Sequence, residues 1–162
     1  MDGIMVELVL WSENPETPID EISQAIGIFP VEEEKIGEIK YFGKQKMLSR
    51  KVEVSSLLYA TDYVNTTEVE TALHEMANII TPKLEIIQDV VCQYRLKVSV
   101  CVVIRLNQKP TVIIPLEFIE IMAKLSADIE FDTYITRKKS NRLLGLLQTI
   151  TSYKGKRKSK TP

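Results

Sequence analysis

The sequence is poor in the residues from which small proteins build covalent or metal-bound frameworks. Its 162 residues include only two cysteines, Cys92 and Cys101, and a single histidine, His74. Two cysteines that form no Cys-x-x-Cys pair exclude a disulfide scaffold, and they favour a reducing cytoplasm. One histidine excludes a metal site with several histidine ligands and argues against a catalytic triad.

Long apolar runs are also missing. No run approaches the ~20 residues that a membrane-spanning helix needs, so no membrane association is predicted. The N-terminus has no basic stretch followed by an apolar segment, so we expect no cleaved secretory signal. None of the six glycines forms a phosphate-binding loop of the dinucleotide or P-loop kind. The sequence therefore predicts no cofactor.

Charges of opposite sign are kept apart along the chain. Residues 1–136 carry 22 acidic and 12 basic side chains, a net charge of −10, whereas residues 137–162 carry nine basic and no acidic side chains. Overall, 44% of the residues are hydrophobic and 27% are charged, which is typical of an ordinary globular domain. We therefore predict one acidic domain over residues 1–136, an appended helix over 137–152 and a basic disordered tail over 153–162.

Hydrophobic periodicity predicts an alternation of strands and helices. Alternating apolar and polar residues predict four strands, at residues 4–11, 51–59, 96–107 and 129–135. Apolar residues three and four apart predict four helices, at residues 18–26, 67–80, 83–93 and 115–125. A strand over 85–91 is the alternative for the third helix. Residues 30–50 read as a surface connection, with a short extended piece around 36–41.

Local signals predict how several of these elements begin and which side they bury. Thr17 is expected to cap the first helix and Gly27 to end it. Thr67-x-x-Glu70 is expected to form a capping box, and Pro82 to interrupt the helical pattern. Two expected apolar faces follow from the spacing alone, Val52, Val54 and Leu58 in one strand and Leu116, Ile119, Met122 and Leu125 in the last helix.

These elements predict an α+β fold with a mostly antiparallel sheet and helices packed on one face. The order strand, turn, helix and extended segment occurs at residues 4–36 and again at 96–135, which suggests ferredoxin-like halves.

Short motifs punctuate the predicted elements: Trp11-Ser12, Gly27-Ile28-Phe29-Pro30, Glu34-Lys35-Ile36-Gly37-Glu38, Pro115-Leu116-Glu117 and Asp132-x-Tyr134. Together they resemble the bacterial family catalogued as domain of unknown function 4279, over about residues 5–136. The resemblance implies a small α+β protein of the bacterial cytoplasm with no established activity, and it supplies no catalytic residues. The basic tail lies beyond the family's pattern.

Three carboxylates form the one candidate metal site. Asp128, Glu130 and Asp132 alternate with apolar residues, so they are expected to share one face of a strand. Oxygen sets of this kind suit magnesium or calcium in a metal-dependent enzyme. The alternative is the wet face of an edge strand, where charge discourages edge-to-edge pairing. Trp11, Asp132 and Tyr134 are the candidates for contact with a partner protein.

The basic tail is a candidate for binding nucleic acid. Its cations are Lys154, Lys156, Arg157, Lys158 and Lys160. Such an arm contacts phosphate backbones without sequence preference, although the acidic body would repel nucleic acid. The leading hypothesis is therefore a non-enzymatic protein-interaction module, with an immunity-like role as its specific version. Binding of nucleic acid or the ribosome through the tail, and metal-dependent catalysis, are the alternatives. The sequence leaves the oligomeric state open.

Overall fold

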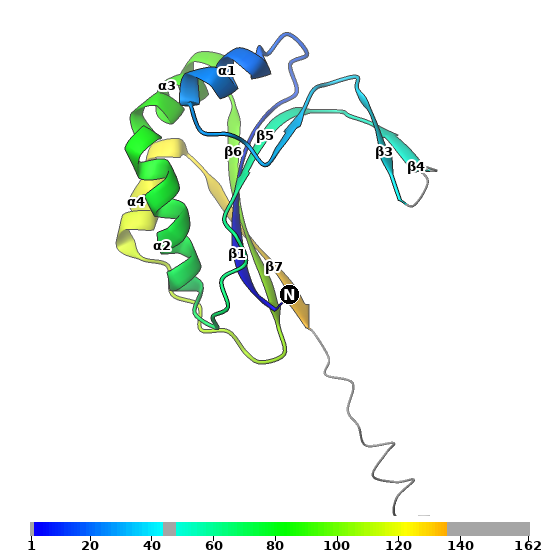
Figure 1. Ribbon diagram of the computed structural model, residues 1–162. Helices are drawn as coiled ribbons and strands as arrows, with labels where there is room; N and C mark the ends of the chain where they lie inside the picture. Colours follow the sequence, from blue (N-terminus) through cyan, green and yellow to red (C-terminus); the bar gives the residue numbers. More distant parts are fainter. Residues whose placement is uncertain (1, 44–47, 136–162) are drawn as a thin grey trace, which may run out of the picture.

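A computed structural model of the chain describes residues 2–43 and 48–135. A five-stranded sheet forms its centre, and the helices cover one of the two sheet faces (Figure 1). The sheet contains, in spatial order, β2 (Glu32–Glu34), β5 (Ser55–Ala60), β1 (Gly3–Ser12), β6 (Lys97–Leu106) and β7 (Asp128–Ile135). The helices are α1 (Ile19–Ile26), α2 (Val69–Ile80), the 3₁₀ turn η2 (Thr81–Lys83), α3 (Leu84–Tyr94) and α4 (Leu116–Leu125). A separate hairpin joins β3 (Ile39–Phe42) to β4 (Leu48–Lys51).

The strand directions define two interlocked β-α-β units. β1 is antiparallel to both β5 and β6, and β2 is antiparallel to β5. β1 therefore runs parallel to β2 with β5 between them, and β5 runs parallel to β6 with β1 between them. This arrangement is the split β-α-β pair of ferredoxin-like folds, and it confirms the predicted α+β class. The second half spans residues 55–106. The predicted echo at residues 96–135 is instead a simple parallel unit, in which α4 leads from β6 to β7 at the sheet edge.

The core lies between the sheet and the helices. Ile4, Val6, Leu8 and Leu10 of β1 are fully buried, as the predicted strand face requires. On α2, the predicted stripe of Val69, Leu73, Met76 and Ile80 is likewise buried. Both stripes follow from the 2.0 and 3.6 residue periods of strands and helices.

Both predicted helix caps are wrong. Neither α1 nor α2 has a side-chain capping hydrogen bond, and Pro18 and Glu68 stand at their N-cap positions. The Thr17 hydroxyl instead donates to Ser12 Oγ, over 2.9 Å. At α2, the backbone N–H of Val69 donates to the carbonyl of Thr111. A backbone hydrogen bond from a distant segment thus satisfies an N–H group at the start of α2, where the capping box was expected to do so. The C-terminal prediction is confirmed, because Gly27 ends α1 in the left-handed conformation.

The predicted strand over 51–59 is two strands. Residues 52–54 separate β4 from β5, and the Val52 N–H donates to the Glu38 carbonyl. Within β5, Leu57 and Tyr59 are buried, whereas Leu58 lies on the opposite sheet face. A shift of one residue exchanges the two faces of a strand, so Leu58 does not belong to the buried face that Leu57 and Tyr59 form, and the expected shared face of Val52, Val54 and Leu58 does not exist. The strand β2 was missed because its sequence, Glu32-Glu33-Glu34, resembles a solvated loop.

The apolar face of α4 is rotated relative to the prediction. Phe118, Ile121 and Leu125 are buried, whereas Leu116 is 71% exposed and Ile119 is 48% exposed. The helix itself is confirmed, as are α3 in place of its strand alternative and the interruption at Pro82. The predictions for residues 137–152 and 153–162 lie outside the described residues. Within the described ranges, no helix is long and apolar enough to cross a membrane.

Candidate interaction face

The sheet face opposite the helices (Figure 1) is here called the open face, and the strand register places many polar residues of the strands on it. Strand register places five rows of side chains across it. From one end to the other, the rows are Glu34-Ser56-Trp11-Lys97, Glu32-Leu58-Val9-Ser99-Asp128, Ala60-Glu7-Cys101-Glu130, Met5-Val103-Asp132 and Gly3-Arg105-Tyr134.

Carboxylates outnumber cations on the open face. Leaving Glu34 aside, the rows contain five acidic side chains and two basic ones; the acids are Glu7, Glu32, Asp128, Glu130 and Asp132. Among the described residues, neither Asp128 nor Glu130 takes part in an ion pair. Val9 and Leu58 lie half-buried beside each other on β1 and β5 and form an apolar strip next to Glu7. The open face therefore combines this apolar strip with an excess of carboxylates.

Each of the two cations lies over an aromatic ring. The Arg105 guanidinium lies between two tyrosines, 5.2 Å from the centroid of the Tyr63 ring and 5.3 Å from that of Tyr134. The Lys97 ammonium lies 4.3 Å from the centroid of the Trp11 ring. Cation–π contacts of this kind hold a cation in place at exposed sites, by ~0.5–1 kcal/mol each. These contacts fix the positive charges at the two ends of the face.

The pKa values of three groups reflect the acidic surroundings. Burial, followed by the charge of Asp132, raises the pKa of the Glu7 carboxyl. Burial also raises the pKa of the Cys101 thiol, with a further contribution from Glu7. The hydrogen bond that the Tyr134 hydroxyl donates to Asp132 Oδ2, over 2.6 Å, raises the pKa of that hydroxyl. A thiol with a raised pKa is a weak nucleophile at neutral pH.

The hairpin is tied to the far end of the open face by ion pairs. Glu34 is buried and accepts from Arg50, at 2.6 Å, and from Lys40, at 2.8 Å. Beyond these pairs the hairpin exposes apolar side chains, with Ile39 and Tyr41 both 58% exposed. Figure 1 shows the hairpin extending from the sheet on the side away from the helices. The hairpin thus presents exposed apolar side chains next to the acidic open face.

The structure places all three predicted partner-contact residues on the open face. Asp132 and Tyr134 are in contact at one end of it, whereas Trp11 lies three rows away, beside Lys97. Sequence reasoning missed Glu7, Arg105 and Tyr63. The alternation of β1 and β6 places Glu7 and Arg105 on this face. Tyr63 precedes Val64, which forms an isolated bridge with Ile4. No local sequence signal predicts that Tyr63 contacts Arg105.

The other candidate residues are less closely grouped. Asp128, Glu130 and Asp132 share one face of β7, as predicted, but the described residues contain no group of three or more acidic, cysteine or histidine side chains placed to hold a metal ion. His74 is exposed, and its Nδ1 lies 2.7 Å from Oε1 of Glu117, which links α2 to α4. The basic residues 154–160 lie outside the described residues.

Comparison with known proteins identifies the chain only at the level of a family. Residues 2–136 match the model of a family described as a domain of unknown function, DUF4279. No curated protein and no solved structure shows a significant match.

Proposed function

The chain belongs to the DUF4279 family, and we propose that it is a non-enzymatic interaction module whose open face binds a cationic segment of a partner protein. The observation that carries the proposal is the charge imbalance of this face. It has five carboxylates, of which Glu32 is paired with Lys40 of the hairpin, against two cations that are already engaged with aromatic rings. A basic segment would gain favourable contacts with Asp128 and Glu130 without first breaking an ion pair.

The apolar strip gives such an interface its centre. Interfaces combine a desolvated apolar core with a polar rim, and aromatic residues supply many of their strongest contacts. Val9, Leu58 and Trp11 would provide the core, and the carboxylates of β7 would form the rim. Complementary charge accelerates association and selects among partners more than it adds affinity.

A specific form of this proposal is an immunity-like role in the bacterial cytoplasm. A protein that neutralises a toxin has to cover a functional surface of that toxin, and many enzymes that attack nucleic acids present a basic one. The acidic open face would bind such a surface through charge complementarity. A gene for a secreted toxin next to the gene for this chain would support this form of the proposal.

The test compares two full-length variants that change the net charge equally. Asp128→Lys with Glu130→Lys reverses the charge of the open face, whereas Glu85→Lys with Glu120→Lys changes exposed positions in the helical layer. Each variant and the unchanged chain would be used for affinity capture from lysate of the source cell, with nuclease treatment and mass spectrometry. We expect one stoichiometric protein that the control variant retains and the open-face variant loses.

Two outcomes would overturn the proposal. A partner that both variants retain would place the binding surface elsewhere. Capture of nucleic acid alone, sensitive to nuclease and lost at ~200 mM salt, would indicate binding through residues 154–160, because phosphate contacts weaken steeply with salt.

A further inference from the structure

Strand β7 lies at the edge of the sheet. It is the last strand in the sheet order, and within residues 2–43 and 48–135 it pairs only with β6. The free edge of a strand directs the N–H and C=O groups of every second residue outward. β7 has eight residues, compared with about five to six in an average strand. Its outer edge therefore offers a long row of backbone groups with which another strand can pair.

The two sides of β7 differ in chemistry. Its carboxylates, Asp128, Glu130 and Asp132, lie on the open face. Phe131 and Thr133 lie on the helix-covered side, because their partners in β6 are buried. Phe131 is nevertheless 41% exposed, and Thr133 is exposed as well. A strand added beyond β7 would therefore meet acidic side chains on one side and a partly exposed aromatic ring on the other.

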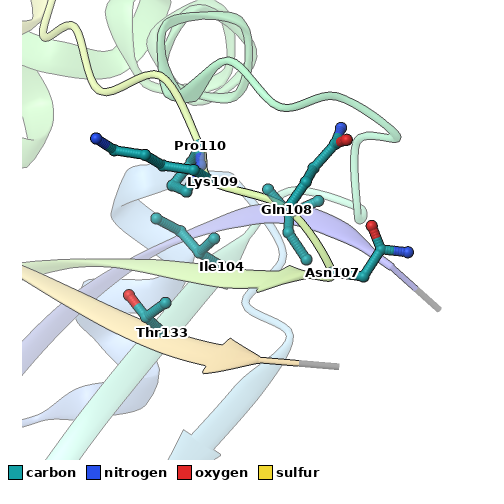
Figure 2. A pocket seen from close by; sticks show the side chains of 7 residues that line it. Ile104, Asn107, Gln108, Lys109, Pro110 and Thr133 are labelled. Carbon is teal, nitrogen blue, oxygen red and sulfur yellow. The ribbon is translucent and has the colours of Figure 1, made fainter. Parts of the chain in front are cut away.

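A pocket lies on the helix-covered side next to Thr133. It has a volume of about 380 Å³, and it is lined by Ile104, Leu106, Thr133 and the loop of residues 107–110. Figure 2 shows the side chains of Ile104 and Thr133 directed toward Pro110 in that loop. Ile104 and Thr133 pair in register, so a strand added beyond β7 would place its next side chain in the same row. The pocket is thus positioned for one apolar side chain of that strand.

We propose that the edge of β7 binds an extended segment of a partner protein in which basic and apolar residues alternate. Main-chain pairing would provide the contact along the strand, and alternate side chains would provide the selectivity. On the open face, lysine or arginine would lie next to Asp128 and Glu130, which take part in no ion pair among the described residues. On the other side, apolar side chains would cover Phe131 and enter the pocket beside Thr133. The inference rests on the proposed function, because the basic residues bind the same carboxylates.

Charge makes a second copy of β7 a poor occupant of this edge. Antiparallel pairing around a twofold axis places the same side chains of both copies on one face. The carboxylates of the two strands would then share that face, and like charges opposite each other destabilise a strand pair. A basic strand reverses the sign of this interaction. Backbone pairing alone does not distinguish sequences, so the carboxylates of β7 select the occupant.

Synthetic peptides test the proposal with the full-length chain. The probe is a fluorescently labelled peptide with blocked ends, as long as β7, in which lysine and valine alternate. A control peptide of the same composition has its lysines and valines in two separate blocks, so it has the same charge without the alternation. We expect the control to bind at least about tenfold more weakly by fluorescence anisotropy, because only alternation directs all the lysines to one face of a strand.

Backbone methylation separates strand pairing from attraction between charges. Neighbouring N–H groups of a strand point to opposite edges, so N-methylation of two adjacent central residues blocks pairing whichever way the peptide runs. The matched control carries the same two methyl groups at one end of the peptide. We expect the centrally methylated peptide to bind at least about tenfold more weakly than this control. The unmethylated peptide should also slow hydrogen exchange at alternate amides of β7 at least about tenfold, because it covers their N–H groups.

Charge reversal identifies the protein side of the contact. Asp128→Lys with Glu130→Lys should weaken binding of the lysine peptide at least about tenfold, whereas Glu85→Lys with Glu120→Lys should leave it within about threefold. The open-face variant should instead bind a peptide in which glutamate replaces lysine. Binding of that peptide would show that the variant is folded, so its loss of the lysine peptide would reflect charge.

Three results would overturn the inference. Equal binding of the two methylated peptides would mean attraction between charges without strand pairing. Slower exchange in β1 and β5 in place of β7 would put the peptide across the open face. No binding of the lysine peptide to the unchanged chain at about 1 mM would exclude the edge as its site. In each case the proposed function still stands if the partner captured from lysate is lost by Asp128→Lys with Glu130→Lys, and both fall if that variant retains the partner.

Discussion

Substitution of Gly3 by alanine should weaken the fold at the place where it positions the open face. Gly3 has φ +150°, and a Cβ at this position would lie 2.4 Å from the carbonyl oxygen of Val64. Real Cβ atoms do not approach a backbone oxygen so closely, and a backbone atom cannot move aside as a flexible side chain does. Val64 also exchanges two backbone hydrogen bonds with Ile4, at 2.9 and 2.8 Å.

The expected loss of stability combines these contributions. The two hydrogen bonds between Ile4 and Val64 are worth about 1 kcal/mol each, and the unfavourable φ adds about 1–2 kcal/mol. Gly3→Ala should therefore lower the free energy of unfolding by about 3–4 kcal/mol. Gly27→Ala is the matched control, because Gly27 also has a positive φ, +69°, but its nearest obstacle is the Lys83 Nζ at 3.7 Å. Only the conformational strain of about 1 kcal/mol applies there.

Urea denaturation of the full-length variants measures both losses from the transition midpoint and slope. A difference of about 2 kcal/mol or more between the two variants is the expected result. A difference below about 0.5 kcal/mol would refute the reasoning, since the strain would then account for the whole effect. Gly3→Ala should also displace Tyr63, which adjoins Val64, and so disturb the ring that holds Arg105.

Three further predictions concern single side chains. Phe118→Ala should cost about 3–5 kcal/mol by urea denaturation, because Phe118 is fully buried; the same result for the exposed Leu116→Ala would contradict the observed face of α4. Folding raises the pKa of Glu7 and so favours its protonated form, so stability is lost as pH rises through that pKa. Glu7→Gln should accordingly raise the melting temperature at pH 7 but not at about pH 3, where the carboxyl is protonated in both states; a gain that persists at low pH would contradict this. Lys97→Ala should shift the emission of Trp11, the only tryptophan, while costing at most ~1 kcal/mol; an unchanged spectrum would show that the contact does not form.

Periodicity predicted the long elements because burial repeats along them. The alternation of β1 and β6 and the stripe of α2 each contain four or more apolar residues at a constant spacing, so chance matches are rare. The hairpin region lacked such a repeat, and its strand β2 consists of three glutamates. Glu34 is buried there with its charge neutralised by Lys40 of β3 and Arg50 of β4, and no local pattern contains that information.

The same contrast applies to the candidate site. Alternation placed the carboxylates of β7 on one face, and the motif Asp132-x-Tyr134 led to the pair that is joined by a hydrogen bond. The contact between Arg105 and Tyr63 depends on a chain crossing that brings together residues 42 positions apart. The buried side of α4 likewise depends on its packing. Several apolar stripes fit the sequence of this helix, and only the one with Phe118, Ile121 and Leu125 is buried.

Inspection of the amino-acid sequence was enough to predict the α+β class, the family, the position of most helices and strands and the separation of acidic from basic residues. These properties depend on composition, short motifs and periods that act over a few residues. The folded structure was needed to establish the strand order, the buried sides of β5 and α4, and the arrangement of five strands into one acidic face. Each of these depends on which distant segments pack together, and the free energy of that packing is a property of the whole chain.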